Sequence, residues 1–131
     1  MQNETLTQTE ENYLKAIFAL CESGEKVAST NALASQLNTS AASVTDMLKR
    51  ISGKGLINYE RHRGVTLTET GDYLAKALVR KHRLWEVFLV NTLKFSWDEV
   101  HDMAEQLEHI QSPELVERLD QFLGRPRFDP H

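Results

Sequence analysis

Cysteine is nearly absent from this chain of 131 residues, which contains only Cys21. A single cysteine excludes an intramolecular disulfide and a zinc site built on several thiolates. Long apolar runs are also missing, so the sequence offers no segment that could span a membrane. Residues 1–11 are polar and lack the apolar core of a signal peptide. These absences predict a soluble, cytoplasmic protein with no membrane partner.

The chain also lacks an overall excess of positive charge, since its net charge is -4. The distribution is more informative than the sum, because a local basic region can bind nucleic acid in an acidic protein. Residues 96–131 are strongly acidic, whereas residues 30–66 are basic. The basic residues of that middle region are Lys49, Arg50, Lys54, Arg61 and Arg63, against Asp46 and Glu60. We therefore expect the middle and the end of the chain to have different roles.

The spacing of apolar residues predicts a mainly α-helical fold. A capping box at Thr7-x-x-Glu10 opens the first helix, which is expected to end near Ser23-Gly24. Two short alternating runs around Arg63-Gly64 predict a two-stranded hairpin at 56–61 and 65–68. The other predicted helices cover about 30–37, 41–52, 69–93, 96–111 and 113–124, the last two opened by Ser96-x-x-Glu99 and by Ser112-Pro113.

Two short helices joined by a tight turn and followed by a hairpin are typical of a winged helix-turn-helix. The helix over 41–52 buries Val44, Leu48 and Ile51 and leaves its small polar groups exposed, so it is the predicted recognition helix. Any three-helix cluster can imitate this pattern, which makes it only moderately specific. The predicted DNA contacts are Thr39, Ser40, Ala42, Ser43, Thr45, Asp46, Lys49 and Arg50, with Arg61 and Arg63 on the wing.

The most informative motif is His101-x-x-x-Glu105-x-x-Glu108-His109. On a helix these four side chains share about 100° of the circumference, opposite an apolar face. The preceding helix offers His82-x-x-x-Glu86, a second pair on one face. Oxygen and nitrogen ligands without thiolate suit manganese or ferrous iron, and also zinc or cobalt. The alternative is a solvated acidic face with incidental histidines.

An enzyme is not expected from these residues. The spacing is not that of His-Glu-x-x-His, and no serine or cysteine nucleophile stands beside a histidine in a turn motif. Two other classes remain as alternatives to a metal-dependent regulator. One is a metal-independent winged-helix regulator with an acidic helical dimerisation region, and the other is a metalloenzyme.

Several motifs together make the chain similar to the diphtheria-toxin-repressor family of metal-dependent repressors. The matching stretches are Thr9-Glu10-Glu11-Asn12-Tyr13-Leu14, Ser43-Val44-Thr45, Gly55-Leu56-Ile57, Leu67-Thr68-Glu69-Thr70-Gly71, Arg80-Lys81-His82-Arg83-Leu84-Trp85-Glu86 and Trp97-Asp98-Glu99-Val100-His101 through Glu108-His109. The resemblance implies a homodimer that binds palindromic operators when loaded with Fe(II) or Mn(II) and represses genes for metal uptake.

The resemblance also implies a ligand set. Glu105, Glu108 and His109 match primary or regulatory ligands, while His82, Glu86 and His101 match a second site, and Asn12 occupies a ligand position on the first helix. Glu105 stands where the iron branch has a thiol ligand, which resembles the manganese branch. Lys15 replaces a manganese-branch Glu and cannot ligate while protonated. The resemblance therefore leaves the metal preference open.

The predicted organisation is an N-terminal winged helix-turn-helix over 1–70 and a helical metal-binding and dimerisation domain over 71–124. The tail over 125–131 corresponds to the start of the connection that leads to an SH3-like domain in longer family members. The chain is then either part of such a protein or a natural two-domain form.

Overall fold

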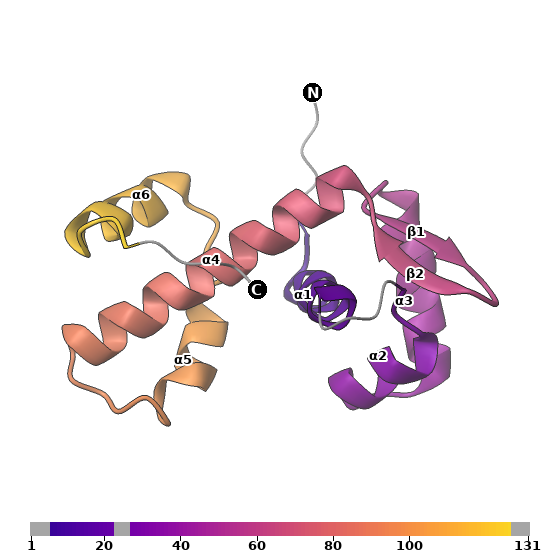
Figure 1. Cartoon of the computed structure of the whole chain (residues 1–131), viewed down its shortest axis with the longest axis horizontal. Coiled ribbons are helices and arrows are strands. Elements are labelled where there is room, and N and C mark those ends of the chain that lie inside the picture. The colour runs from indigo at the N-terminus through magenta and orange to yellow at the C-terminus, as the bar shows by residue number, and fades with distance from the viewer. Residues whose placement is uncertain (1–5, 23–26, 127–131) are drawn as a thin grey trace. The chain divides into compact units, whose positions relative to one another are not determined.

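The computed structural model describes residues 6–22 and 27–126 of the chain. Within these ranges the helices are α1 (Gln8–Glu22), α2 (Thr30–Leu37), α3 (Ala41–Gly53), α4 (Glu69–Asn91), α5 (Val100–Leu107) and α6 (Pro113–Phe122), and the strands are β1 (Ile57–Glu60) and β2 (Gly64–Leu67) (Figure 1). The described residues up to Lys76 form one compact unit, and those from Ala77 onward form a second. The boundary falls inside α4, so this helix contributes to both.

The first unit has the winged helix-turn-helix architecture that the sequence predicts. Helices α2 and α3 are joined by a tight turn, in which Asn38 adopts the left-handed conformation with φ of 55°. Strands β1 and β2 pair antiparallel, with Ile57 opposite Leu67 and Glu60 opposite Gly64. Ala28 adds one further bridge to Val65 on β2. Fully buried side chains from α1, α2, α3 and β2 form the core, including Ile17, Leu33, Leu48, Ile51 and Val65.

Two glycines allow close backbone approaches in this unit. A Cβ atom on Gly71, in the first turn of α4, would lie 2.0 Å from the carbonyl oxygen of Leu56. Gly64 has φ of +105°, and a Cβ there would lie 2.5 Å from the carbonyl oxygen of Ala28. Any side chain at either position would displace backbone, so these glycines hold the wing against its neighbours.

The second unit is helical and packs around a small apolar core. Its buried centre consists of Leu84 and Trp85 from α4, Ala104 from α5 and Leu119 from α6. The partly buried side chains around it are Phe88, Leu107, Val116 and Leu123. Within the described ranges, no helix is both long and apolar enough to span a membrane.

Helix starts follow the predicted signals in most cases. The capping box of α1 forms, since Glu10 N–H donates to Thr7 Oγ1 at 3.1 Å and Thr7 N–H donates to Glu10 Oε1 at 2.9 Å. Ser40 caps α3, and Ser112 caps α6 with Pro113 in its first turn. The predicted end of α1 near Ser23-Gly24 lies outside the described residues, as does most of the predicted tail. The predicted fold class, a winged helix-turn-helix followed by a helical domain, is confirmed.

The predicted helix over 96–111 is wrong at both ends. Helix α5 begins only at Val100, and residues 97–99 form a turn. The hydroxyl of Ser96 lies 2.6 Å from a carboxylate oxygen of Asp98 and 2.8 Å from one of Glu99, so it acts as a donor and does not cap a helix that starts beside it. The helix ends at Leu107, which leaves Glu108 as its C-cap residue and places His109 in the following turn.

Candidate metal centre and nucleic-acid interface

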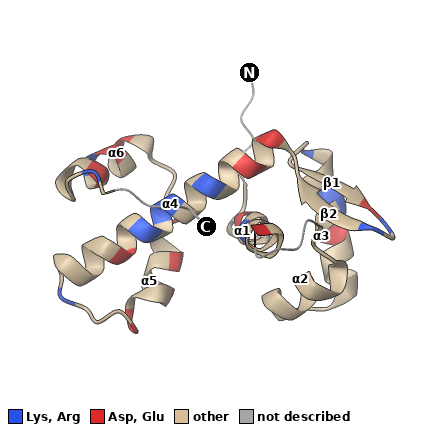
Figure 2. Ribbon diagram, in the orientation of Figure 1, with Lys and Arg blue, Asp and Glu red and all other residues tan. Residues whose placement is uncertain are grey.

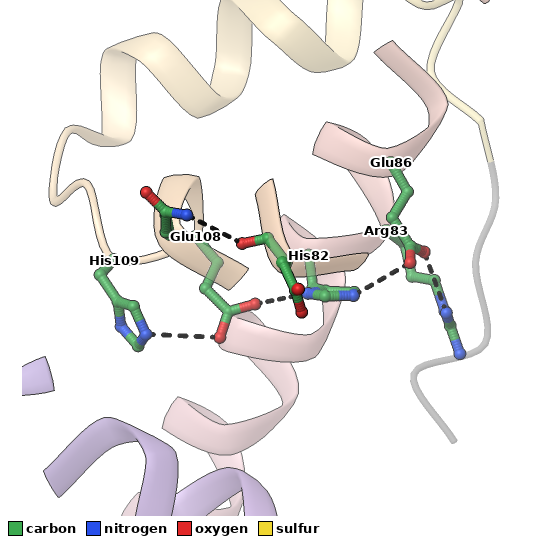
Figure 3. Close-up of polar contacts among 7 residues, drawn as sticks. His82, Arg83, Glu86, Glu108 and His109 are labelled. Carbon is green, nitrogen blue, oxygen red and sulfur yellow. Dashed lines mark hydrogen bonds and ion pairs between the residues drawn. The ribbon is translucent and has the colours of Figure 1, made fainter. Parts of the chain in front are cut away.

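The candidate metal centre is built around His82, a buried side chain of α4 in the second unit. Its Nδ1 lies 2.6 Å from Oε1 of Glu108, and its Nε2 lies 3.1 Å from Oε2 of Glu86 (Figure 3). Glu86 follows one helical turn after His82, which explains why the two side chains meet. Glu108 comes from a different helix, so α5 packing against α4 is what completes the arrangement.

The position of Glu108 follows from the early end of α5. As the C-cap residue it keeps helical backbone angles, with φ of -64°, and its side chain is completely buried. Its second oxygen, Oε2, lies 3.6 Å from Nε2 of His109. Figure 3 shows the Glu108 carboxylate between the two imidazole rings. One buried carboxylate therefore contacts two histidines from two separate segments.

His101 connects this buried cluster to a more exposed one. Its ring centroid lies 5.0 Å from that of His82. Ligand atoms of His82, Glu86 and His101 all lie within 4.8 Å of one another, and so do those of His101, Asp102 and Glu105. Asp102 is absent from the ligands predicted by the sequence. Its position directly after His101 and three residues before Glu105 is the helical spacing that could have suggested it.

The residues present fit a divalent cation. The carboxylates of Glu86 and Glu108 are both buried beside one imidazole, and buried carboxylates are costly without nearby positive charge. Arg83 supplies part of that charge through a 3.1 Å hydrogen bond to Glu86 Oε1. The donor set of imidazole nitrogens and carboxylate oxygens is one that manganese, ferrous iron and zinc accept. Each nitrogen of His82 must give up its present hydrogen bond in order to coordinate.

Asn12, the remaining predicted ligand, lies on α1 in the first unit. Its Oδ1 is buried and accepts no hydrogen bond from the described residues. A buried amide oxygen without a partner is rare and costs stability. Its free lone pairs leave Asn12 able to act as an oxygen ligand. The other six predicted ligands all belong to the second unit, on α4, on α5 or directly after α5.

The predicted DNA-contacting residues lie on the exposed side of α3 and in the turn before it. Val44, Leu48 and Ile51 point into the core, whereas Thr45 is half-buried. Ser40 Oγ accepts from Ser43 N–H at 3.1 Å and lies 3.0 Å from the Ser43 hydroxyl, so both residues sit at the positive end of the helix. The exposed members of the predicted set on this element are Thr39, Ser40, Ala42, Ser43, Asp46, Lys49 and Arg50.

The wing presents basic side chains at its tip. Arg61 and Arg63 are exposed in the turn between β1 and β2, where Figure 2 shows basic residues at the end of the hairpin. Arg63 forms an exposed ion pair with Glu60 at 3.3 Å. Such a pair contributes little to stability, so Arg63 remains available for an external phosphate.

Sequence reasoning missed a buried ion pair at the end of α3. Lys54 Nζ donates to both carboxylate oxygens of Glu10, at 3.0 and 3.1 Å, and Glu10 is 1% exposed. Burial by itself would raise the pKa of Glu10, but hydrogen bonds from Thr7 N–H and Lys54, together with the charges of Lys54 and Arg50, lower the pKa overall. Nothing in helical spacing relates Glu10 to Lys54, because the contact joins distant parts of the sequence.

A winged helix-turn-helix followed by a helical, ligand-rich domain defines a class of DNA-binding regulators with a metal-binding region. Comparison with known families agrees. Residues 5–65 match the N-terminal DNA-binding domain of iron-dependent repressors, and residues 68–131 match their metal-binding and dimerisation domain. The chain belongs to the diphtheria-toxin-repressor family of metal-dependent transcriptional repressors, which are DNA-binding proteins and not enzymes.

Several relatives are similar over most of this chain. A helix-turn-helix-type transcriptional regulator of Methanocaldococcus jannaschii is 36% identical over 120 residues, covering 92% of this chain and 96% of its own length. The iron-dependent repressor IdeR of Mycobacterium tuberculosis is 36% identical over 125 residues, covering 95% of this chain. A solved manganese-dependent repressor in complex with manganese is 43% identical and superposes over 93% of this chain with a TM-score of 0.82. The chain spans 54% of IdeR and 56% of the manganese-dependent repressor.

Proposed function

We propose that this chain represses transcription by binding operator DNA when it holds Mn(II) or Fe(II). The observation that carries the proposal is the buried arrangement of Glu86, His82 and Glu108, in which two carboxylates flank one imidazole. A bound divalent cation would add positive charge directly beside these two buried carboxylates. The similarity to iron- and manganese-dependent repressors supports the same class of metal.

The proposed ligands are His82, Glu86, His101, Glu105, Glu108, His109 and Asn12. Six of them belong to the second unit, and Asn12 belongs to the first. Metal binding alters DNA affinity only if the metal binds more tightly to the conformation that fits DNA. Zn(II) and Co(II) are expected to bind the same donor set in vitro.

The proposed DNA surface consists of the exposed face of α3, the turn before it and the wing. Serine and threonine hydroxyls beside the α3 N-terminus suit phosphate oxygens, and Lys49, Arg50, Arg61 and Arg63 add charge. A dimer places two such surfaces on one duplex, which suits a palindromic operator. We expect the regulated genes to serve metal uptake and the protein to act in the cytoplasm, where its operator lies.

The test is operator binding measured with and without metal. A duplex is first selected from a random-sequence library with the chain in Mn(II), and in parallel with the chain in chelator. Binding is then titrated with Mn(II), Fe(II) and Zn(II). The proposal expects at least about a tenfold gain in affinity with Mn(II) or Fe(II), in line with a typical allosteric coupling. Equal binding in chelator would instead identify a metal-independent regulator.

A further inference from the structure

Glu10 connects α1 to the far end of the recognition helix. It occupies the first turn of α1, two positions before Asn12, and its side chain is 1% exposed. Its carboxylate accepts from Lys54 Nζ through both oxygens, at 3.0 and 3.1 Å, and its Oε2 lies 3.7 Å from a guanidinium nitrogen of Arg50. The two cations come from one short segment, since Arg50 lies in the last turn of α3 and Lys54 is its C-cap residue.

The contacts of Glu10 hold the start of α1 against the end of α3. Glu10 lies near the positive end of α1, and its Oε1 also accepts from the backbone N–H of Thr7. Lys54 lies at the negative end of α3, where its own backbone N–H bonds to the carbonyl of Ile51 at 3.0 Å. Each charge is therefore favoured by the helix end at which it sits as well as by its partner. One carboxylate thus fixes the start of α1 and the end of α3 together.

We infer that Glu10 is a positioning residue for sequence-specific DNA binding, because it holds the recognition helix in place through Lys54. This inference rests on the proposed function. Charge alone would disfavour an acid here, since a negative group beside Arg50 and Lys54 weakens the local attraction for phosphate. The benefit of Glu10 must then lie in geometry. Geometry affects the reading of bases, whereas charge affects specific and non-specific DNA alike.

The informative quantity is the ratio of affinities for the selected duplex and for a scrambled duplex of the same composition. It is measured with the full chain, in Mn(II) and in chelator, for Glu10→Gln, Lys54→Met and the double variant. We expect each single change to lower the ratio by about fivefold, and the double variant to lose no more than either alone, as for residues acting through one contact. Scrambled-duplex binding by Glu10→Gln should stay equal or become slightly stronger.

Two controls separate positioning from other effects. Thr7→Ala removes the hydroxyl that accepts from the backbone N–H of Glu10 at 3.1 Å, so it weakens the start of α1 while leaving the contact between Glu10 and Lys54 in place. Asp72→Asn removes a comparable negative charge, from an exposed pair with Lys76 at 3.1 Å. Neither should change the ratio. The same ratio in Glu10→Gln as in the wild type, or an equal loss in Thr7→Ala, would overturn the inference.

The comparison of wild-type DNA binding in Mn(II) and in chelator tests the proposed function separately from the role of Glu10. If chelator leaves the DNA affinity of the wild type unchanged, metal dependence is contradicted. The ratio of specific to non-specific affinity can still be measured for each variant on the duplex selected in chelator. A normal metal response in the wild type, together with unchanged ratios in the variants, contradicts only the role of Glu10.

Discussion

Nδ1 of His82 lies 2.6 Å from Oε1 of Glu108, although the two residues belong to different helices. The Glu108 side chain is fully buried and that of His82 is nearly so, so neither residue can be altered without affecting the other. It also brings the end of α5 to the middle of α4, where Glu86 meets the opposite nitrogen of the same ring.

Glu108→Gln should lower the affinity for Mn(II) by at least about tenfold. Replacing even a residue that only hydrogen-bonds to a metal ligand typically lowers metal affinity by that factor. Glutamine keeps the shape of the side chain and can still accept from His82, so the fold should persist. The measurement is calorimetric titration of the chain with Mn(II). Glu114→Gln is the matched control, since Glu114 is an exposed acid on α6 whose ion pair with Arg118 lies in solvent, away from the histidines. Equal affinity in both variants would argue against Glu108 as a ligand.

Arg61→Ala should weaken binding to selected and scrambled duplexes in parallel, because a wing arginine contacts phosphate and not base edges. The slope of log affinity against log salt should fall by about one unit, the value for one lost phosphate contact. Affinities are measured by fluorescence anisotropy over a series of salt concentrations. Arg118→Ala removes the same charge from the exposed face of α6 and should leave the slope unchanged. A loss confined to the selected duplex would indicate base reading by the wing.

Trp97→Asp should weaken the homodimer about tenfold or more, which is the usual cost of removing an aromatic anchor from an interface. Trp97 is 60% exposed in the single chain, and Leu93 and Phe95 beside it are also exposed. Exposed apolar groups of this size favour an interface over contact with water. Sedimentation at several concentrations gives the dissociation constant. Tyr73→Asp is the control, because Tyr73 is a 73% exposed aromatic residue in the first unit. A wild-type chain that stays monomeric at every concentration would contradict the prediction.

Glu117→Gln should reduce stability near neutral pH but not in acid. A hydrogen bond from Arg125 and its positive charge hold the pKa of Glu117 below its ordinary value of 4.5. A carboxyl group whose pKa is lowered by folding stabilises the fold above the ordinary pKa, and this contribution disappears as the pH falls through the lowered value. The difference in urea midpoint between wild type and variant, measured in chelator, should be small at pH 6 because the pair is exposed, and should shrink as the pH is lowered below 4.5. A difference that grows in acid would contradict this assignment.

Local signals in the sequence predict most of the fold because they act over a few residues. The Thr7–Glu10 box, the Ser40 and Ser112 caps and the alternating pattern of the wing all form where expected. The helix start predicted at Ser96 does not form, and the reason is equally local. Its hydroxyl donates to nearby carboxylates, and the helix begins four residues later. A capping motif in the sequence does not show which of its side-chain groups will donate.

Contacts between distant residues could be predicted only in part. Helical spacing relates His82 to Glu86 because they lie one turn apart on the same element. It cannot relate His82 to Glu108, or Glu10 to Lys54, since these pairs depend on how separate helices pack. The shared helical face predicted for Glu108 and His109 also assumed that α5 continues, whereas it ends at Leu107. The resemblance to known repressors supplied these ligand candidates, but not the hydrogen bonds between them.

The absence of a side chain at Gly71 lets the start of α4 lie directly against the base of the wing. The first turn of α4 lies so close to the Leu56 carbonyl that no other residue fits, so this end of the helix is fixed to the base of the wing. His82 lies about three turns further along the same helix. A substitution at Gly71 would therefore disturb the base of the wing and the start of the helix that carries His82 at the same time.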